Sequence, residues 1–277
     1  MPNLSPHAAK FQRAADVINE ADALIITAGA GMGVDSGLPD FRGKEGFWQA
    51  YPALAKARLH FQDIANPSAF RAYPHRAWGF YGHRLNLYRS TVPHEGFAIL
   101  KRIGESMPEG MFVFTSNVDG QFHKAEFSGK RVQECHGSIH HLQCLDGCMA
   151  DIWPTDEFHP QVNEESGLLI SDLPRCPYCG EVARPNILMF GDGGWLGHRS
   201  ELQEANLNAW LRKIHRPVVI EIGAGQSIPT VRRFGEERNG FLIRINPTEP
   251  DLNGLACIGF RMGGLEALCG IEIALGA

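Results

Sequence analysis

Three features are missing from this sequence, and each absence excludes a class of protein. There is no run of about 18 apolar residues, so we expect no membrane span. There is no uninterrupted apolar segment near the N-terminus, where Asp16, Glu20 and Asp22 break the pattern, so we expect no signal peptide and a cytoplasmic protein. There is no basic excess, since 26 Lys and Arg stand against 31 Asp and Glu, for a formal net charge of −5. This charge argues against nucleic acid as a main partner.

The cysteines also lack the even count that is typical of a disulfide framework. The sequence has seven, and four of them form two close pairs. With no secretion signal, this clustering favours a metal site over disulfides. Two short knuckles that together supply four thiolates suit a tetrahedral structural Zn²⁺, bound by Cys144, Cys148, Cys176 and Cys179. Four free thiols or a redox pair are the alternative.

The order of apolar segments predicts an α/β fold. The length of 277 residues suits one large α/β domain, or one domain with a small module. Strands are expected at 23–28, 111–115, 132–135, 217–222 and 241–247, and helices at 7–21, 94–104, 199–214 and 231–237. This alternation predicts a doubly wound parallel sheet. Residues 44–95 are rich in aromatics and are expected to form two or three short helices.

The stretch Ala23–Gly43 is the most informative part of the chain. An apolar strand leads into Gly29-Ala30-Gly31-Met32-Gly33 and ends in Pro39-Asp40-Phe41-Arg42. A strand followed by a glycine-rich turn lets the backbone approach a pyrophosphate. Glycines after a strand are often only a tight turn, but a simple turn has no use for an Asp-Phe-Arg tripeptide.

Polar residues follow two further strands. Ser116, Asn117 and Asp119 come after the second strand, where open α/β sheets place their ligand groups. His136 comes after the third strand and is a candidate general base, with a structural histidine as the alternative. Tyr81 and Arg84 are three residues apart and share one helix face, which on spacing alone also fits a surface aromatic–cation pair.

Together these motifs resemble the sirtuins, the family of NAD-dependent protein deacylases. The similarity covers roughly residues 20–250 and keeps the family order. It rests on Gly29-Ala30-Gly31 through Arg42, Thr115-Ser116-Asn117-Val118-Asp119, His136-Gly137-Ser138, the two cysteine pairs, Arg184-Pro185-Asn186, Phe190-Gly191-Asp192 and Ile245-Asn246.

The resemblance implies an architecture of two parts. A Rossmann-like NAD-binding domain would comprise residues 1–44, 96–138 and 184–277. A smaller domain would be formed by two insertions, a helical one at 45–95 and a zinc module at 139–183. An acylated lysine of a protein substrate would enter the cleft between the two domains.

The resemblance also implies a chemistry, in which the acyl group moves to ADP-ribose and nicotinamide is released. His136, Asn117 and Asp119 would be catalytic, with His136 as general base on a ribose hydroxyl. The co-substrate NAD would contact Ala28, Gly29, Ala30, Gly31, Met32, Asp40, Phe41, Arg42, Ser116, Asn117, Asp119, His136, Gly223, Ala224, Gly225, Gln226 and Asn246. The acyl-lysine would contact Tyr81, Arg84, Met189, Phe190 and Gly191. Tyr81 and Arg84 match a Tyr-x-x-Arg pair that reads acidic acyl groups such as succinyl, so both deacetylation and desuccinylation are implied.

The chain departs from the family pattern at several positions. Ser116 stands where the family usually has Gln, and Gly223-Ala224-Gly225 replaces a Gly-Thr-Ser stretch, which removes two hydroxyl donors. Backbone N–H groups can still bind phosphate there. These changes keep open a mono-ADP-ribosyltransferase or an NAD hydrolase on the same scaffold, and a non-catalytic NAD-sensing module is a third reading.

Overall fold

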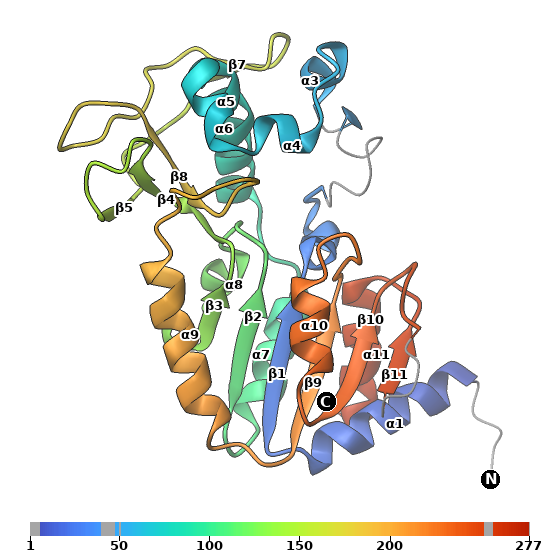
Figure 1. Ribbon diagram of the computed structural model, residues 1–277. Coiled ribbons are helices and arrows are strands. Elements are labelled where there is room, and N and C mark those ends of the chain that lie inside the picture. The colour runs from blue at the N-terminus through green and yellow to red at the C-terminus, as the bar shows by residue number, and fades with distance from the viewer. Residues whose placement is uncertain (1–5, 40–47, 50, 252–256, 277) are drawn as a thin grey trace.

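The structure is a computed structural model that describes residues 6–39, 48, 49, 51–251 and 257–276. Figure 1 shows a large sheet with helices on both faces and, above it, a smaller lobe of helices and short strands. No helix among the described residues is long and apolar enough to span a bilayer. The expected residues Asp40, Phe41 and Arg42 lie outside the described part of the chain.

The large sheet is parallel throughout its described strands. Its order is β11-β10-β9-β1-β2-β3, and each neighbouring pair is parallel. The bounds are β1 (Ala23–Ala28), β2 (Met111–Thr115), β3 (Val132–Glu134), β9 (Pro217–Ile222), β10 (Phe241–Ile245) and β11 (Cys257–Phe260). All six residues of β1 are buried, as expected for a central strand that is covered on both faces.

Helices cover both faces of this sheet (Figure 1). Leu24 and Ile26 of β1 pack in one core with α1 (Pro6–Glu20), α7 (Glu95–Glu105) and α11 (Gly264–Leu275). Ala23 and Ile25 point to the opposite face and pack in another core with α9 (His198–Leu211) and α10 (Thr230–Glu236). The alternation along β1 therefore directs successive apolar side chains to opposite cores. The predicted doubly wound fold is confirmed.

The smaller lobe has its own aromatic core. Its helices are α3 (Pro52–Lys56), α4 (Phe61–Ile64), α5 (Pro67–Ala72) and α6 (Pro74–Ser90). Its strands are β4 (Gly137–Cys144), β5 (Ile152–Pro154), β6 (Val162–Asn163), β7 (Leu168–Leu169) and β8 (Ala183–Ile187). Trp78, Phe80 and Tyr81 of α6 are buried against Leu142 of β4 and Ile187 of β8. The remaining short helices are η1 (Ala30–Ser36), α8 (Gln121–Lys124) and η2 (Gly129–Arg131).

Strand β8 departs from the expected division, which assigned residues 184–277 to the NAD-binding domain. It pairs with β4 in an antiparallel sheet, with Gln143 opposite Arg184. The physical reason is that β4 leads into the first cysteine knuckle and β8 leaves the second, so pairing them brings the two knuckles together. The division into a large domain and two insertions stays a prediction, and this pairing favours placing residues 184–187 with the smaller lobe.

Candidate active site

The site lies where the winding of the large sheet reverses. From β1 the chain continues to β2 and β3 on one side, and it then crosses to β9 on the other side of β1. Ligands of open α/β sheets bind at the carboxyl ends of the strands at such a switch point. The loops that follow β1 and β9 are the two glycine-rich segments beginning at Gly29 and Gly223.

These two loops touch each other through their backbones. The N–H of Gly31 donates to the carbonyl of Gly223 at 3.1 Å. A Cβ added at Gly29 would lie 2.7 Å from the Gly223 oxygen, and one at Gly223 would lie 2.3 Å from the Gly31 Cα. Gly223 also has a φ of +62°. Glycine is therefore required at both positions by the close approach of the loops.

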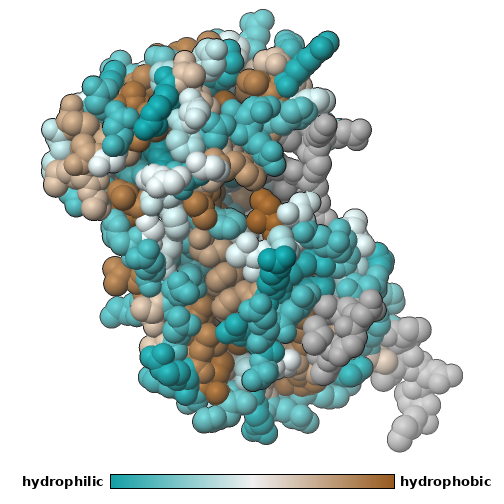
Figure 2. Space-filling model, viewed as in Figure 1, coloured by the Kyte–Doolittle hydropathy of each residue, from teal (hydrophilic) through white to brown (hydrophobic). Residues whose placement is uncertain are grey.

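A cavity of about 890 Å³ opens beside these loops and extends to the smaller lobe. Figure 2 shows the narrow waist between the lobes, where apolar side chains reach the surface. The predicted site residues that line the cavity are Gly29, Ala30, Tyr81, Arg84, Ser116, Asn117, Asp119, His136, Met189, Phe190, Gly223, Ala224 and Gly225. The described site residues outside this lining are Ala28, Gly31, Met32, Gly191, Gln226 and Asn246.

The turn after β2 holds two of the predicted catalytic residues. Asn117 donates from its side-chain Nδ2 to the carbonyl of Gly29 at 3.0 Å, which ties this turn to the loop after β1. Asp119 is 8 % exposed and accepts the N–H of Gln121 at 2.9 Å. Burial raises the pKa of Asp119 to about 6, because desolvation disfavours the carboxylate.

His136 lies in the two-residue turn between β3 and β4 and lines the same cavity. Burial lowers the pKa of its imidazole below the ordinary value, so the ring is neutral near pH 7 and has a lone pair to accept a proton. The next residue, Gly137, has a φ of +77°, and a Cβ there would lie 2.1 Å from the carbonyl oxygen of Asn186. The backbone at His136 is therefore fixed by close contact with β8.

One residue near this turn was missed by the sequence analysis. A ring nitrogen of His140 lies 2.9 Å from the carbonyl oxygen of Asp119. A carbonyl only accepts, so this nitrogen carries the proton. A Cβ added at Gly120 would lie 2.7 Å from the same ring. His140 thus supports the turn that carries Asn117 and Asp119, although nothing in the sequence pattern around it indicated this contact.

The far end of the cavity is formed by one face of α6. Arg84 and Tyr81 are 7 % and 1 % exposed, so they do not form the surface pair that their spacing also allowed. Arg84 donates from Nε and Nη2 to the hydroxyl of Tyr88 at 3.0 and 2.7 Å. Burial raises the pKa of Tyr81 to about 12, which keeps its hydroxyl a donor. Tyr88 was missed, although its position four residues after Arg84 places both on one helix face.

The loop after β8 closes one side of the cavity through Met189 and Phe190. The N–H of Phe190 donates to the carbonyl of Ala65 at 3.0 Å. The carboxylate of Asp192 accepts two bonds from Arg184, at 2.6 and 2.8 Å, and both side chains are buried. Such a bidentate pair holds the loop in one geometry against the smaller lobe.

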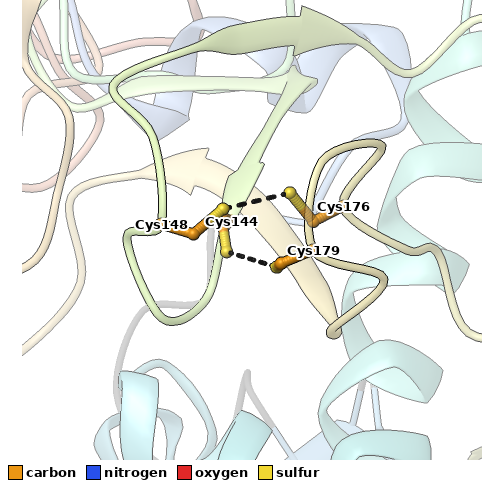
Figure 3. Close-up of side chains that lie close together, drawn as sticks. All are labelled: Cys144, Cys148, Cys176 and Cys179. Atoms are coloured by element: carbon orange, nitrogen blue, oxygen red, sulfur yellow. Dashed lines mark hydrogen bonds between the residues drawn. The ribbon is translucent and has the colours of Figure 1, made fainter.

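The four paired cysteines converge in the smaller lobe (Figure 3). Their sulfur atoms all lie within 4.8 Å of one another. The Cys144–Cys179 and Cys148–Cys176 sulfur separations are 3.7 and 3.5 Å. A tetrahedron with Zn–S bonds of about 2.3 Å has edges of about 3.8 Å, so this donor set fits structural zinc. Four protein thiolates leave no open position on such an ion, and its role would be to hold the two knuckles together.

Comparisons with known proteins show the family and the fold of this chain. The model of the Sir2 family matches residues 29–211. The chain is 28 % identical over 251 residues to NAD-dependent protein deacylase 1 of Archaeoglobus fulgidus, which covers 88 % of this chain and 89 % of that protein. It is 28 % identical over 241 residues to the NAD-dependent protein deacylase of Aquifex aeolicus, covering 86 % and 89 %. A crystal structure of a Sir2 homologue–NAD complex superposes with a TM-score of 0.71 at 22 % identity, covering 95 % of this chain and 93 % of that one.

Proposed function

The chain belongs to the Sir2 family, and from this membership we propose that it is an NAD-dependent protein-lysine deacylase. The reaction transfers the acyl group of a modified lysine to ADP-ribose and releases nicotinamide. The observation that carries the proposal is one cavity in which Asn117, Asp119 and His136 lie with the glycine loops of β1 and β9. Relatives that carry the deacylase name align over nearly their whole length.

The lining of the cavity supports NAD as the co-substrate. Two backbone loops without side chains at their point of contact can approach a pyrophosphate closely. The turn after β2 and the loops at Gly29 and Gly223 would hold the dinucleotide. Asp40, Phe41 and Arg42 are proposed to complete this site. Bound there, NAD supplies the ribose carbon that accepts the acyl oxygen when nicotinamide leaves.

Each of the proposed catalytic residues has a separate role in the reaction. His136 is the general base on a ribose hydroxyl, and its lowered pKa supports this role because the neutral ring is the proton acceptor. Asn117 orients the ribose and a water molecule. Asp119 binds the nicotinamide carboxamide from a buried position. His140 acts through Asp119 and has no contact of its own with substrate in this proposal.

The acyl end of the cavity supports an acidic acyl group. A carboxylate in a buried pocket requires a charge-assisted partner. Arg84 offers a buried guanidinium and Tyr81 a protonated hydroxyl. We therefore propose that succinyl-lysine is a substrate in addition to acetyl-lysine, with Met189 and Phe190 beside the lysine chain.

The proposed setting is the cytoplasm, with acylated lysines of proteins as substrates and without a nucleic-acid or membrane partner. The formal net charge of −5 supports the exclusion of nucleic acid, because a phosphate backbone requires a basic surface.

The test is nicotinamide release from NAD with and without acyl-lysine peptides. We expect release only with peptide, in equal amount to the deacylated product, and loss of both in His136→Ala. A panel of acetyl, succinyl and longer acyl peptides then identifies the preferred acyl group. Equal release without peptide would indicate an NAD hydrolase. Transfer of label from NAD to protein without deacylation would indicate a mono-ADP-ribosyltransferase.

A further inference from the structure

We propose that Arg232 is a positioning residue for the dinucleotide, which turns the backbone N–H of Gly225 toward a phosphate group. The inference rests on the proposed function, since it assumes that a dinucleotide lies against the loop after β9. Arg232 belongs to none of the motifs that carry the family resemblance, and it does not line the cavity itself.

The starting observation is a backbone carbonyl with an unusual number of donors. Arg232 of α10 is 6 % exposed and donates from Nε and Nη2 to the carbonyl of Ala224, at 3.1 and 3.0 Å. Asn246, after β10, donates from Nδ2 to the same oxygen at 3.0 Å. Two side chains from two elements therefore hold this one carbonyl.

Holding the carbonyl also sets the direction of the following N–H. In a planar trans peptide the C=O and the N–H of the next residue point in opposite directions. No cis peptide bond occurs in the described part of the chain. The Ala224 oxygen faces Arg232 inside the protein, so the Gly225 N–H faces away from it. Gly225 lines the cavity, and a Cβ added there would meet nothing within 4 Å, so the space beside it is open.

The two side chains that hold the carbonyl are themselves fixed by one neighbour. Arg232 Nη2 donates to the Glu249 carboxylate at 2.8 Å and to its carbonyl at 3.1 Å. The N–H of Glu249 donates to Asn246 Oδ1 at 3.0 Å. Arg232, Asn246 and Glu249 thus lock the loop after β9 to the loop after β10.

The contacts among Arg232, Asn246 and Glu249 can compensate for the missing hydroxyl groups at Ala224 and Gly225. At positions 224 and 225, where the family pattern has side-chain donors, this chain has only backbone donors. A backbone donor binds an anion well only if its direction is fixed before the anion arrives. Arg232 supplies that fixed direction without touching the ligand.

The test is binding of ADP-ribose by calorimetry, together with the KM for NAD and for the acyl peptide. Arg232→Met keeps an unbranched apolar side chain in place of the arginine stem and removes its donors. We expect the Kd of ADP-ribose and the KM of NAD to rise roughly tenfold or more, because a bond to a charged phosphate is among the stronger hydrogen bonds. The KM of the peptide stays within about twofold, and Arg232→Lys recovers part of the affinity. Arg233→Met, in the exposed neighbour on the same helix, is the matched control.

A second variant guards against loss of folding in Arg232→Met. Asn246→Asp keeps the acceptor for the Glu249 N–H and removes the donor to Ala224, so it should weaken ADP-ribose in the same direction. A merely structural role would lower the melting temperature and the active fraction and leave the Kd of the folded molecules unchanged. Folded Arg232→Met or Asn246→Asp protein with the Kd of Arg233→Met would overturn the proposal. A wild-type protein that binds ADP-ribose but releases no nicotinamide would contradict the deacylase function and leave this inference standing.

Discussion

Replacing Gly137 with alanine should cost far more stability than its small size suggests. Gly137 has a φ of +77°, and an L-residue in this left-handed region costs about 1–2 kcal/mol. The added Cβ would also lie 2.1 Å from the carbonyl oxygen of Asn186, deep inside normal contact distance. That oxygen belongs to a β8 backbone paired with β4, so it cannot rotate away as a side chain would. Overpacking of this kind adds about 1–3 kcal/mol.

We therefore expect Gly137→Ala to lower the free energy of unfolding by about 2–5 kcal/mol. Gly276→Ala is the matched control, because Gly276 has a φ of +85° and nothing within 4 Å of an added Cβ. The control should lose only the backbone term of about 1–2 kcal/mol. Denaturant unfolding of both variants measures the difference. Equal losses would refute the claim that contact with β8, and not the φ angle alone, requires this glycine.

The same variant should also affect catalysis in the molecules that still fold. Gly137 follows His136 directly, so relief of the clash moves the backbone that carries the proposed base. A displacement of about 1 Å at a reacting group can cost on the order of 100-fold in rate. We expect kcat to fall in folded Gly137→Ala, while the kcat of the folded control stays close to wild type. Unchanged kcat in folded Gly137→Ala would show that the clash is relieved on the β8 side only.

Four shorter predictions concern the acyl pocket, the base, the metal and the pH dependence of stability. Arg84→Met should lower kcat/KM for a succinyl peptide about 10–100-fold relative to an acetyl peptide, and equal losses for both would contradict the acyl pocket. The acidic limb of kcat/KM should lie below about pH 6.5, because burial lowers the pKa of His136; a limb above that pH would exclude it as the base. A strong chelator should lower the melting temperature, and Zn²⁺ but not Mg²⁺ should restore it; a melting curve indifferent to both would argue for free thiols. Burial lowers the pKa of His141 to about 4, so the unfolded state binds its proton first as the pH falls, and the free energy of unfolding should decrease between about pH 6.5 and 4. His141→Gln should flatten that slope, and an unchanged slope would assign it to other groups.

The strands of the large sheet were predictable because burial on both faces demands continuous apolar runs. β1 is such a run except for Thr27, and β9 except for Glu221, and the structure has both strands at the expected positions. β11 and α11 were not predicted. α11 contains Gly270, which reads as a poor helix residue, yet a Cβ there would lie 2.4 Å from the ring of Phe11 in α1. The glycine serves the packing of two helices that are distant in sequence, and no local pattern contains that information.

In the site, too, some residues follow from the local sequence pattern, while others depend on contacts between distant segments. Asn117, Asp119 and His136 follow strands of one parallel sheet, and the carboxyl ends of such strands meet at one edge, so sequence order alone predicts their meeting. His140 and Arg232 act on carbonyls that belong to other elements. Their roles depend on which backbone carbonyl each side chain contacts, and no sequence pattern predicts those contacts.

In the sequence, the loss of two hydroxyl donors from the loop after β9 suggests weaker phosphate binding. In the structure, backbone N–H groups with a fixed direction can replace those donors. The side chains of Ala224 and Gly225 contain no hydrogen-bond donor for a phosphate. Counted as backbone, the loop after β1 has its Gly29 carbonyl held by Asn117, and the loop after β9 has its Ala224 carbonyl held by Arg232 and Asn246. In both loops the N–H that follows the held carbonyl is turned away from the holding group. At the loop after β9, affinity for an anion therefore depends on Arg232, which is buried behind the loop. Its substitution should weaken binding of the dinucleotide although its side chain does not contact the ligand.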